Sequence, residues 1–123
     1  MDPISFQLCE IRPDGHVTGR NCGGDMPVGV TFTAVSRVVF PPKEPDEPLI
    51  TPPAEFVATI ALRLDTAEAY QHRLDIVYSG MTALLGLSGT GLDVLSDLID
   101  QAPPSTYYSL VAPDALYSNT RNA

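Results

Sequence analysis

Residues 56–64 read FVATIALRL, a stretch in which larger apolar side chains alternate with small or polar ones. Successive side chains of an extended strand point to opposite sides. The alternation therefore places five apolar residues on one face: Phe56, Ala58, Ile60, Leu62 and Leu64. This period of two predicts a β-strand with that face buried against a core.

Similar stretches lie on both sides of this strand. Further strands are predicted over Ile4–Ile11, His16–Arg20, Val28–Phe40, Ile76–Tyr78 and Met81–Leu87. Turns separate them, as at Pro13-Asp14-Gly15, where proline presets φ and glycine accepts a positive φ. Another turn is expected at Gly89-Thr90-Gly91. Several short strands with glycine- and proline-marked turns are typical of a small all-β barrel or sandwich.

The stretch 41–53 has a different composition, PPKEPDEPLITPP, dense in proline and acidic residues. Proline lacks a backbone donor and fixes φ, so a central strand or a helix is excluded here. We interpret 41–53 as a long loop inserted between two strands. The alternative is a docking motif for an aromatic-lined groove on another protein.

Two later segments carry helical signals. Asp65 with Glu68 imitates a capping box, so local signals alone predict a short helix over Asp65–Asp75. After the Gly89–Gly91 turn, four apolar residues follow at helical spacing: Leu92, Leu95, Leu98 and Ile99. Thr90 is the expected cap of that helix and Asp93 an acidic residue in its first turn.

The chain from residue 105 onward is expected to add one strand, beginning at Thr106-Tyr107-Tyr108, and then a frayed polar tail. We divide the chain accordingly into a barrel domain, 1–104, and a C-terminal extension, 105–123.

The net charge of the chain argues against some classes of binding partner. The 123 residues include 15 acidic and 7 basic side chains, for a formal net charge of −8. Such a surface repels phosphate backbones and anionic membranes, which argues against broad nucleic-acid or membrane binding. A local patch around Arg12, Arg20 and Arg37 stays open as an exception. The acidity itself serves solubility or the docking of a basic protein.

The N-terminal sequence lacks the basic start and apolar core of a secretory signal, and no run approaches the roughly 20 apolar residues of a membrane span. Two cysteines, Cys9 and Cys22, are too few for a disulfide scaffold or a four-ligand zinc site. We expect a cytoplasmic protein with reduced thiols, and a single Cys9–Cys22 disulfide is the alternative.

Three blocks occur in a fixed order along the chain. They are Val17-Thr18-Gly19-Arg20 followed by Gly24 and Val28-Gly29, then TAEAYQH at 66–72, then GMTALLGLSG at 80–89. In order and spacing they resemble VTGRVERGxxxVG, GIEMFRK and GDNVGLLLRG of the second domain of elongation factor Tu and related translation factors. The resemblance covers residues 4–102. It implies a small, closed, Greek-key-like translation-factor β-barrel without its GTPase, with at most one or two short helical turns.

The resemblance changes one local prediction and conflicts with another. It favours an extended, bent strand over Asp65–Asp75, which we adopt in place of the helix. It also compares Asp97-Leu98-Ile99 with a final short strand, whereas the spacing of the leucines predicts a helix there.

Candidate binding residues also come from the resemblance. Arg20 matches the arginine of the family's TGR, and Glu68 matches an acidic residue near the pocket for the acceptor end of aminoacyl-tRNA. Tyr70 matches an aromatic position of the same block. In place of the family's acidic residue after Val-Gly, this chain has Val30. No GxxxxGK[ST] motif is present, so GTP binding is not implied.

Residues with catalytic chemistry are sparse. His16 and His72 are the only histidines, and no GxSxG motif accompanies the serines. Glu68 and His72 would align on a helix but not on a strand, so a metal site is not predicted. We therefore expect no catalytic residues, no metal and no cofactor.

The sequence thus predicts a non-catalytic, elongation-factor-Tu-domain-2-like module that binds a protein. One alternative is an immunity or inhibitor protein that neutralises a basic toxin or nuclease. A second is a translation-associated factor that contacts aminoacyl-tRNA or the ribosome.

Overall fold

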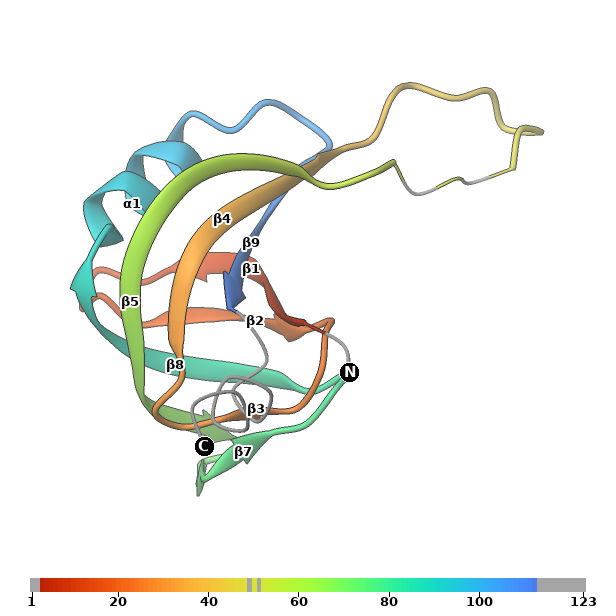
Figure 1. The fold of residues 1–123 in the computed structure, drawn as a ribbon. Coiled ribbons are helices and arrows are strands. Elements are labelled where there is room, and N and C mark those ends of the chain that lie inside the picture. Colours follow the sequence, from red (N-terminus) through yellow and green to blue (C-terminus); the bar gives the residue numbers. More distant parts are fainter. Residues whose placement is uncertain (1–2, 49, 51, 113–123) are drawn as a thin grey trace, which may run out of the picture.

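The computed structural model describes residues 3–48, 50 and 52–112. Six antiparallel strands form a closed ring, in the order β4, β9, β1, β2, β8, β5 and back to β4 (Figure 1). Their bounds are β1 Ile4–Ile11, β2 Val17–Asn21, β4 Thr31–Val39, β5 Glu55–Ala69, β8 Thr82–Thr90 and β9 Thr106–Ala112. The predicted small all-β barrel is therefore confirmed.

The remaining elements cover the two ends of the ring. A helix, α1 (Leu92–Asp100), lies across one end, and its Leu95 is fully buried (Figure 1). At the other end β3 (Met26–Pro27) pairs with β7 (Ile76–Val77), and Met26 and Val77 are fully buried there. A short strand, β6 (His72–Leu74), pairs with the end of β5.

The core is filled by alternate residues of the ring strands. The inward side chains are Ile4, Phe6, Leu8, Val17, Phe32, Val35, Ile60, Leu62, Leu64, Ala83, Leu85, Leu110 and Ala112. Each large apolar side chain buried in this way contributes about 1.5–3 kcal/mol to folding. Gly19 admits the close approach of β1, because a Cβ there would lie 2.1 Å from the carbonyl oxygen of Gln7. No side chain other than hydrogen fits at that point of the ring.

β5 bends around the barrel because its register shifts three times, twice against β4 and once against β8. Each shift inserts an extra residue of β5, which increases the local bend. Asp65 is the extra residue opposite β8, so Ala67 and not Thr66 continues the buried row after Leu64. Phe56, predicted on the buried face, is 70% exposed. That prediction is wrong, because Phe56 lies beyond both shifts against β4, where the strand leaves the barrel.

The bent strand predicted over Asp65–Asp75 is confirmed only as far as Ala69, because the chain then reverses in a hairpin. β5 runs to Ala69, the chain turns at Tyr70 and Gln71, and β6 returns antiparallel to β5. The short helix suggested by the Asp65–Glu68 spacing is wrong, because both residues lie within β5, where Glu68 pairs with Leu84 and Asp65 is the bulge residue.

The helix predicted from the leucine spacing is confirmed as α1. Asp97-Leu98-Ile99, which the resemblance compares with a strand, lies inside the helix. The predicted cap is wrong: Thr90 is the last residue of β8, and Gly91, with φ 116°, occupies the N-cap position without a side-chain hydrogen bond. The turn expected at Gly89–Gly91 is accordingly shorter, since β8 continues to Thr90.

The strand predicted over Val28–Phe40 begins only at Thr31. Gly29 has φ 107°, and the Val30 N–H donates to the carbonyl oxygen of Pro27. This turn separates β3 from β4.

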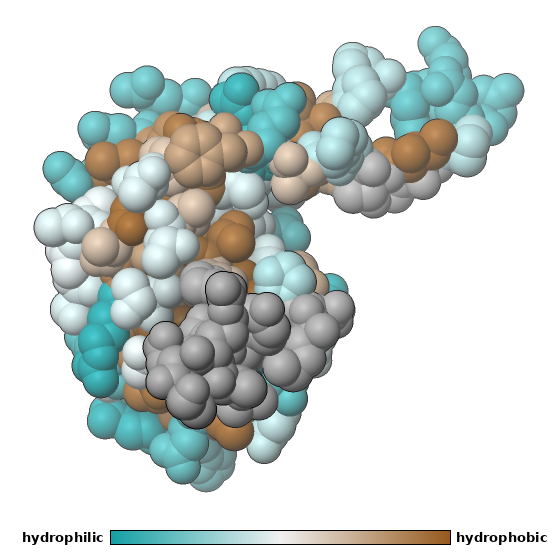
Figure 2. All heavy atoms as spheres, viewed as in Figure 1, coloured by the Kyte–Doolittle hydropathy of each residue, from teal (hydrophilic) through white to brown (hydrophobic). Residues whose placement is uncertain are grey.

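The proline-rich stretch joins β4 to β5 as a loop without helix or strand among its described residues. It projects well away from the barrel as an arm (Figure 1). Its outer part is hydrophilic (Figure 2) and carries Glu44, Asp46 and Glu47, all exposed. The predicted loop insertion is confirmed for these residues.

The strand expected near the C-terminus is β9, and it lies between β1 and β4 within the ring. The predicted frayed tail concerns residues 113–123, which lie outside the described residues. Both cysteines are free and exposed, so the disulfide alternative is wrong. Within the described ranges, no helix has the length and apolar character needed to cross a membrane.

Candidate functional site

Three neighbouring strands of the ring, β2, β8 and β5, share one continuous outer surface. The side chains that alternate with the core residues lie on it in rows across the strands. In one row Thr18 lies opposite Leu84, which lies opposite Glu68. In the next row Arg20 lies opposite Thr82. We call the surface that these five residues form, together with Tyr70 just beyond the end of β5, the three-strand face.

All three residues predicted from the resemblance meet on this face. Glu68 and Tyr70 line a shallow hollow of about 310 Å³, together with Thr18, Ala69, Thr82, Ala83 and Leu84. Arg20 is exposed beside it, one row further along, but is not part of its lining. The fold thus brings together residues that are up to 50 positions apart in the sequence.

Tyr70 stands out in two ways. Tyr70 is 90% exposed, more than any other large hydrophobic residue that the structure describes. The φ of Tyr70 is 53° and that of Gln71 is 66°, so two consecutive non-glycine residues adopt the left-handed conformation. Two-residue hairpin turns with positive φ at both positions favour Asn-Gly. A non-glycine residue there costs about 1–2 kcal/mol, so this turn holds Tyr70 outward against a conformational penalty.

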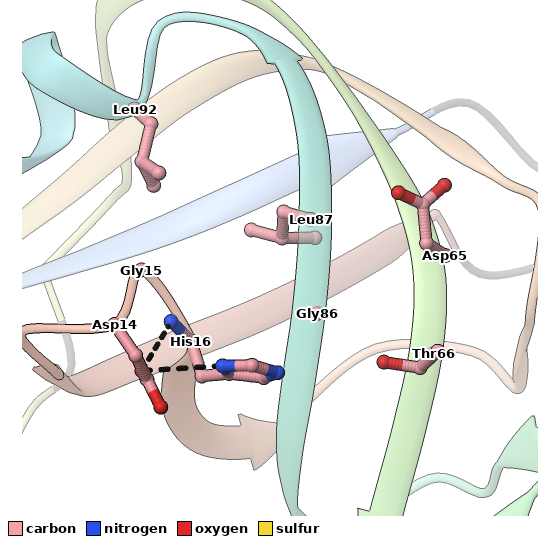
Figure 3. A pocket seen from close by; sticks show the side chains of 8 residues that line it. All are labelled: Asp14, Gly15, His16, Asp65, Thr66, Gly86, Leu87 and Leu92. Atoms are coloured by element: carbon pink, nitrogen blue, oxygen red, sulfur yellow. Dashed lines mark hydrogen bonds and ion pairs between the residues drawn. The ribbon is translucent and has the colours of Figure 1, made fainter.

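A second depression lies one row further along the same strands, on the side away from Arg20. It encloses about 280 Å³ and is lined by Asp14, Gly15, His16, Asp65, Thr66, Gly86, Leu87 and Leu92 (Figure 3). We call it the Gly86 cleft. The turn between β1 and β2 supplies one wall, β5 the opposite wall, and the start of α1 the apolar end.

Gly86 allows the Thr66 hydroxyl to approach β8 closely at the floor of this cleft. A Cβ built on Gly86 would lie 2.3 Å from the hydroxyl oxygen of Thr66 and 3.5 Å from Nε2 of His16. The His16 ring reaches from the β1–β2 turn toward Gly86, and the Thr66 hydroxyl points toward it from the other side (Figure 3). Gly86 does not have a positive φ, so its role here is to leave room rather than to turn the chain.

Asp14 holds His16 in this orientation. One carboxylate oxygen of Asp14 accepts the backbone N–H of His16 at 3.0 Å and lies 3.1 Å from Nδ1 of the ring. The Nδ1 atom is fully buried, and its contact with Asp14 is close but not aligned as a hydrogen bond. The pKa of Asp14 is lowered, chiefly by the hydrogen bond from the His16 backbone.

The second carboxylate of the cleft is also stabilised in its charged form. The pKa of Asp65 is lowered, first by a hydrogen bond from Ser88 and then by Arg63, whose Nη1 lies 2.7 Å away. The cleft therefore contains two ionised carboxylates at neutral pH. Arg63 is not part of its lining.

Among the residues that the structure describes, no group of three or more His, Cys, Asp and Glu side chains is placed to hold a metal ion. The sequence alone had not pointed to the Gly86 cleft. One signal was present: a glycine in the middle of a strand often marks a bulge or the close approach of another group.

Comparisons with protein-family models, with curated proteins and with solved structures find no match. The resemblance to the translation-factor barrel therefore rests on the sequence blocks alone.

Proposed function

We propose that this protein is a non-catalytic binding module that docks a protein partner on the three-strand face, with Tyr70 as the central anchor. The observation that carries the proposal is the hairpin turn at Tyr70 and Gln71. Backbone strain of this kind persists where the surrounding structure enforces it, and it gathers at binding and switch sites. Here the strain displays one large aromatic side chain to solvent.

The chemistry around Tyr70 supports a protein partner. Tyrosine and arginine are enriched among the few residues that dominate binding energy at protein interfaces. Tyr70 borders a hollow with apolar area from Leu84 and Ala69, and Glu68 and Arg20 supply polar groups at its edge. This combination of an aromatic anchor and a polar rim is typical of an interface core. The net charge of −8 favours a basic partner.

The test is a pull-down from host lysate with the tagged full chain, read by mass spectrometry. We expect Tyr70→Ala to lose a partner that the unmodified chain retains, by about 2 kcal/mol or more in binding free energy. Tyr107→Ala is the matched control, since Tyr107 is a tyrosine on β9 that is 46% exposed. Recovery of no specific partner, or equal recovery with Tyr70→Ala, would contradict the proposal.

The acidic arm favours a second candidate, an inhibitor of a basic toxin or nuclease. The only lysine, Lys43, donates to the carbonyl oxygens of Glu44 and Glu47 at 3.3 and 3.1 Å. The Lys43 charge is thus held beside Glu44 and Glu47, and the other charged side chains of the arm are carboxylates. In the same pull-down, one basic protein that high salt releases, and that the triple variant Glu44→Gln/Asp46→Asn/Glu47→Gln no longer binds, would favour this candidate.

The translation-associated alternative predicts tRNA or ribosomal proteins in the eluate. In that case Arg20→Ala and Glu68→Gln become the decisive variants, because these residues carry the resemblance to the acceptor-end pocket.

A further inference from the structure

We infer that the Gly86 cleft is a subsite for the side-chain ammonium of a lysine on the docked partner. The identity of the protein that supplies the lysine rests on the proposed function, whereas the chemistry of the cleft stands on its own geometry.

Three kinds of hydrogen-bond acceptor line the cleft of about 280 Å³. His16 Nε2 and the Thr66 hydroxyl both lie within 3.5 Å of the point where a Cβ on Gly86 would stand. Asp14 is the nearest charged group to Nδ1 of His16, at 3.1 Å. In the tautomer with its proton on Nδ1, on the side of Asp14, Nε2 is an acceptor toward the cleft. The carboxylates of Asp14 and Asp65 add acceptors at the two sides.

An ammonium group matches this arrangement. It carries three donors on one compact charge, which suits acceptors that converge from separate strands. A guanidinium group is planar and suits paired acceptors in one plane. Leu87 and Leu92, the apolar part of the lining, are placed to contact the alkyl stem of the lysine. Lysine stems lie along apolar surface while the charged end stays in a polar environment.

The charge of the lining decides against an anion. α1 begins at Leu92, and its N-cap lacks a side-chain hydrogen bond, so its free N–H groups would attract a negative ligand. Against this stand the carboxylates of Asp14 and Asp65 in the cleft and that of Asp93 in the first turn of α1. Asp65 is paired with Arg63, and the two remaining carboxylates still outweigh the partial positive charge of one helix end.

The cleft and the Tyr70 hollow lie along the same strands, so one partner can cover both. His16, Thr18 and Arg20 occupy three successive outward positions, so His16 and Arg20 are about 13 Å apart at the rise of an extended strand. That span fits easily within a standard protein interface, which buries roughly 800 Å² on each side. A partner anchored at Tyr70 can therefore present a lysine to Gly86.

The probe for the test is lysine capped at both ends, N-acetyl-lysine methylamide, added to the full chain and followed by two-dimensional amide NMR. We expect saturable shifts at Thr66 and Gly86, with a dissociation constant on the order of 1 mM, as is usual for a ligand of this size. Capped norleucine, which has the stem without the charge, is expected to give no saturable shift at these residues.

Two variants of the cleft and one control complete the experiment. Gly86→Ala places a methyl group against the Thr66 hydroxyl, which must shift, and is expected to weaken capped-lysine binding at least tenfold. Thr66→Val keeps the strand propensity and removes only the hydroxyl, so it gives a second reading if Gly86→Ala impairs folding; about a threefold loss is expected. Thr59→Val changes an exposed threonine of β5 that lines neither the cleft nor the Tyr70 hollow, and it is expected to leave binding unchanged.

Several outcomes would overturn the inference. Shifts that spread over the acidic surface without saturating, or affinity that survives both cleft variants, would remove the site. Binding of a free diamine such as putrescine much more tightly than capped lysine would reject a partner lysine as the ligand. Tyr70→Ala separates the two proposals: it should bind capped lysine normally, so failure of the Tyr70 anchor and failure of the cleft are read independently.

Discussion

Two hairpin turns of this barrel reach positive φ in opposite ways. Between β1 and β2, Pro13 occupies the second position of the turn and Gly15 the fourth, and the Gly15 N–H donates to the Arg12 carbonyl oxygen at 2.9 Å. Gly15 adopts its φ of 90° without a side-chain penalty. Between β5 and β6, Tyr70 and Gln71 adopt φ of 53° and 66° with full side chains.

The difference indicates what each turn serves. The β1–β2 turn has the residues that a type I turn with a following glycine favours, and it places His16 with no strain of its own. The β5–β6 turn lacks the favoured residues and displays an aromatic side chain. We therefore expect substitutions in the β1–β2 turn to lower the free energy of unfolding. Substitutions in the β5–β6 turn should raise the free energy of unfolding and weaken partner binding.

The largest effect is expected at Gly15. Gly15→Val should lower the free energy of unfolding by about 2–3 kcal/mol, because a β-branched residue at φ 90° is strained. Crowding is not the cause, since a Cβ there would meet only Leu92 Cδ2, at 3.6 Å. Urea unfolding measures the change. Asparagine tolerates positive φ, so Gly15→Asn should lower the free energy of unfolding clearly less than Gly15→Val. Equal decreases in the two variants would contradict the strain argument.

The opposite sign is expected at the other turn. Tyr70→Asn/Gln71→Gly should raise the free energy of unfolding by about 1–2 kcal/mol, because Asn-Gly suits two consecutive positive φ values. The same variant should lose the partner of the unmodified chain. Gln71→Gly alone is the control, since it relieves part of the strain and keeps Tyr70, so it should retain the partner. A double variant that is no more stable than the unmodified chain would show that the turn is not strained.

The smallest effect concerns pH and again separates the turns. The pKa of Asp14 is lowered below its usual 3.8 because its carboxylate accepts the His16 N–H. A lowered pKa in the folded state contributes stability above the ordinary pKa, and this stability is lost as pH falls through the folded value. The β5–β6 turn residues Tyr70 and Gln71 carry no carboxylate.

Acid unfolding followed by circular dichroism tests this contribution. Asp14→Asn keeps an oxygen that can accept the N–H and removes the charge, so the midpoint of acid unfolding should move slightly relative to the unmodified chain. Asp14→Ala removes the acceptor too and should also lower stability at neutral pH. Identical acid profiles for Asp14→Asn and the unmodified chain would exclude a role for the Asp14 charge.

Much of the fold was accessible from local pattern. The alternation in residues 56–64 located the central part of β5, the turn at Pro13-Asp14-Gly15 was placed correctly, and the spacing from Leu92 to Ile99 predicted α1. Arg20, Glu68 and Tyr70, chosen from a resemblance, lie on one face, although their role in binding stays a prediction.

The candidate sites required the pairing of distant strands. The positive φ of Tyr70 and Gln71 carries no sequence signal, because neither residue is a turn former. The Gly86 cleft exists because β8 lies between His16 and Thr66, which are 50 positions apart.

By itself, the sequence determined which segments are extended, where the proline-rich arm leaves the barrel and that the surface is acidic. These properties follow from side-chain periodicity, backbone restriction and charge, all of which act over a few residues. Only the tertiary structure decided that Phe56 is exposed, that Ala67 rather than Thr66 is buried and that His16 faces Thr66 across Gly86. These depend on the register of strands distant in sequence, and one extra residue in a strand is enough to exchange its inner and outer faces.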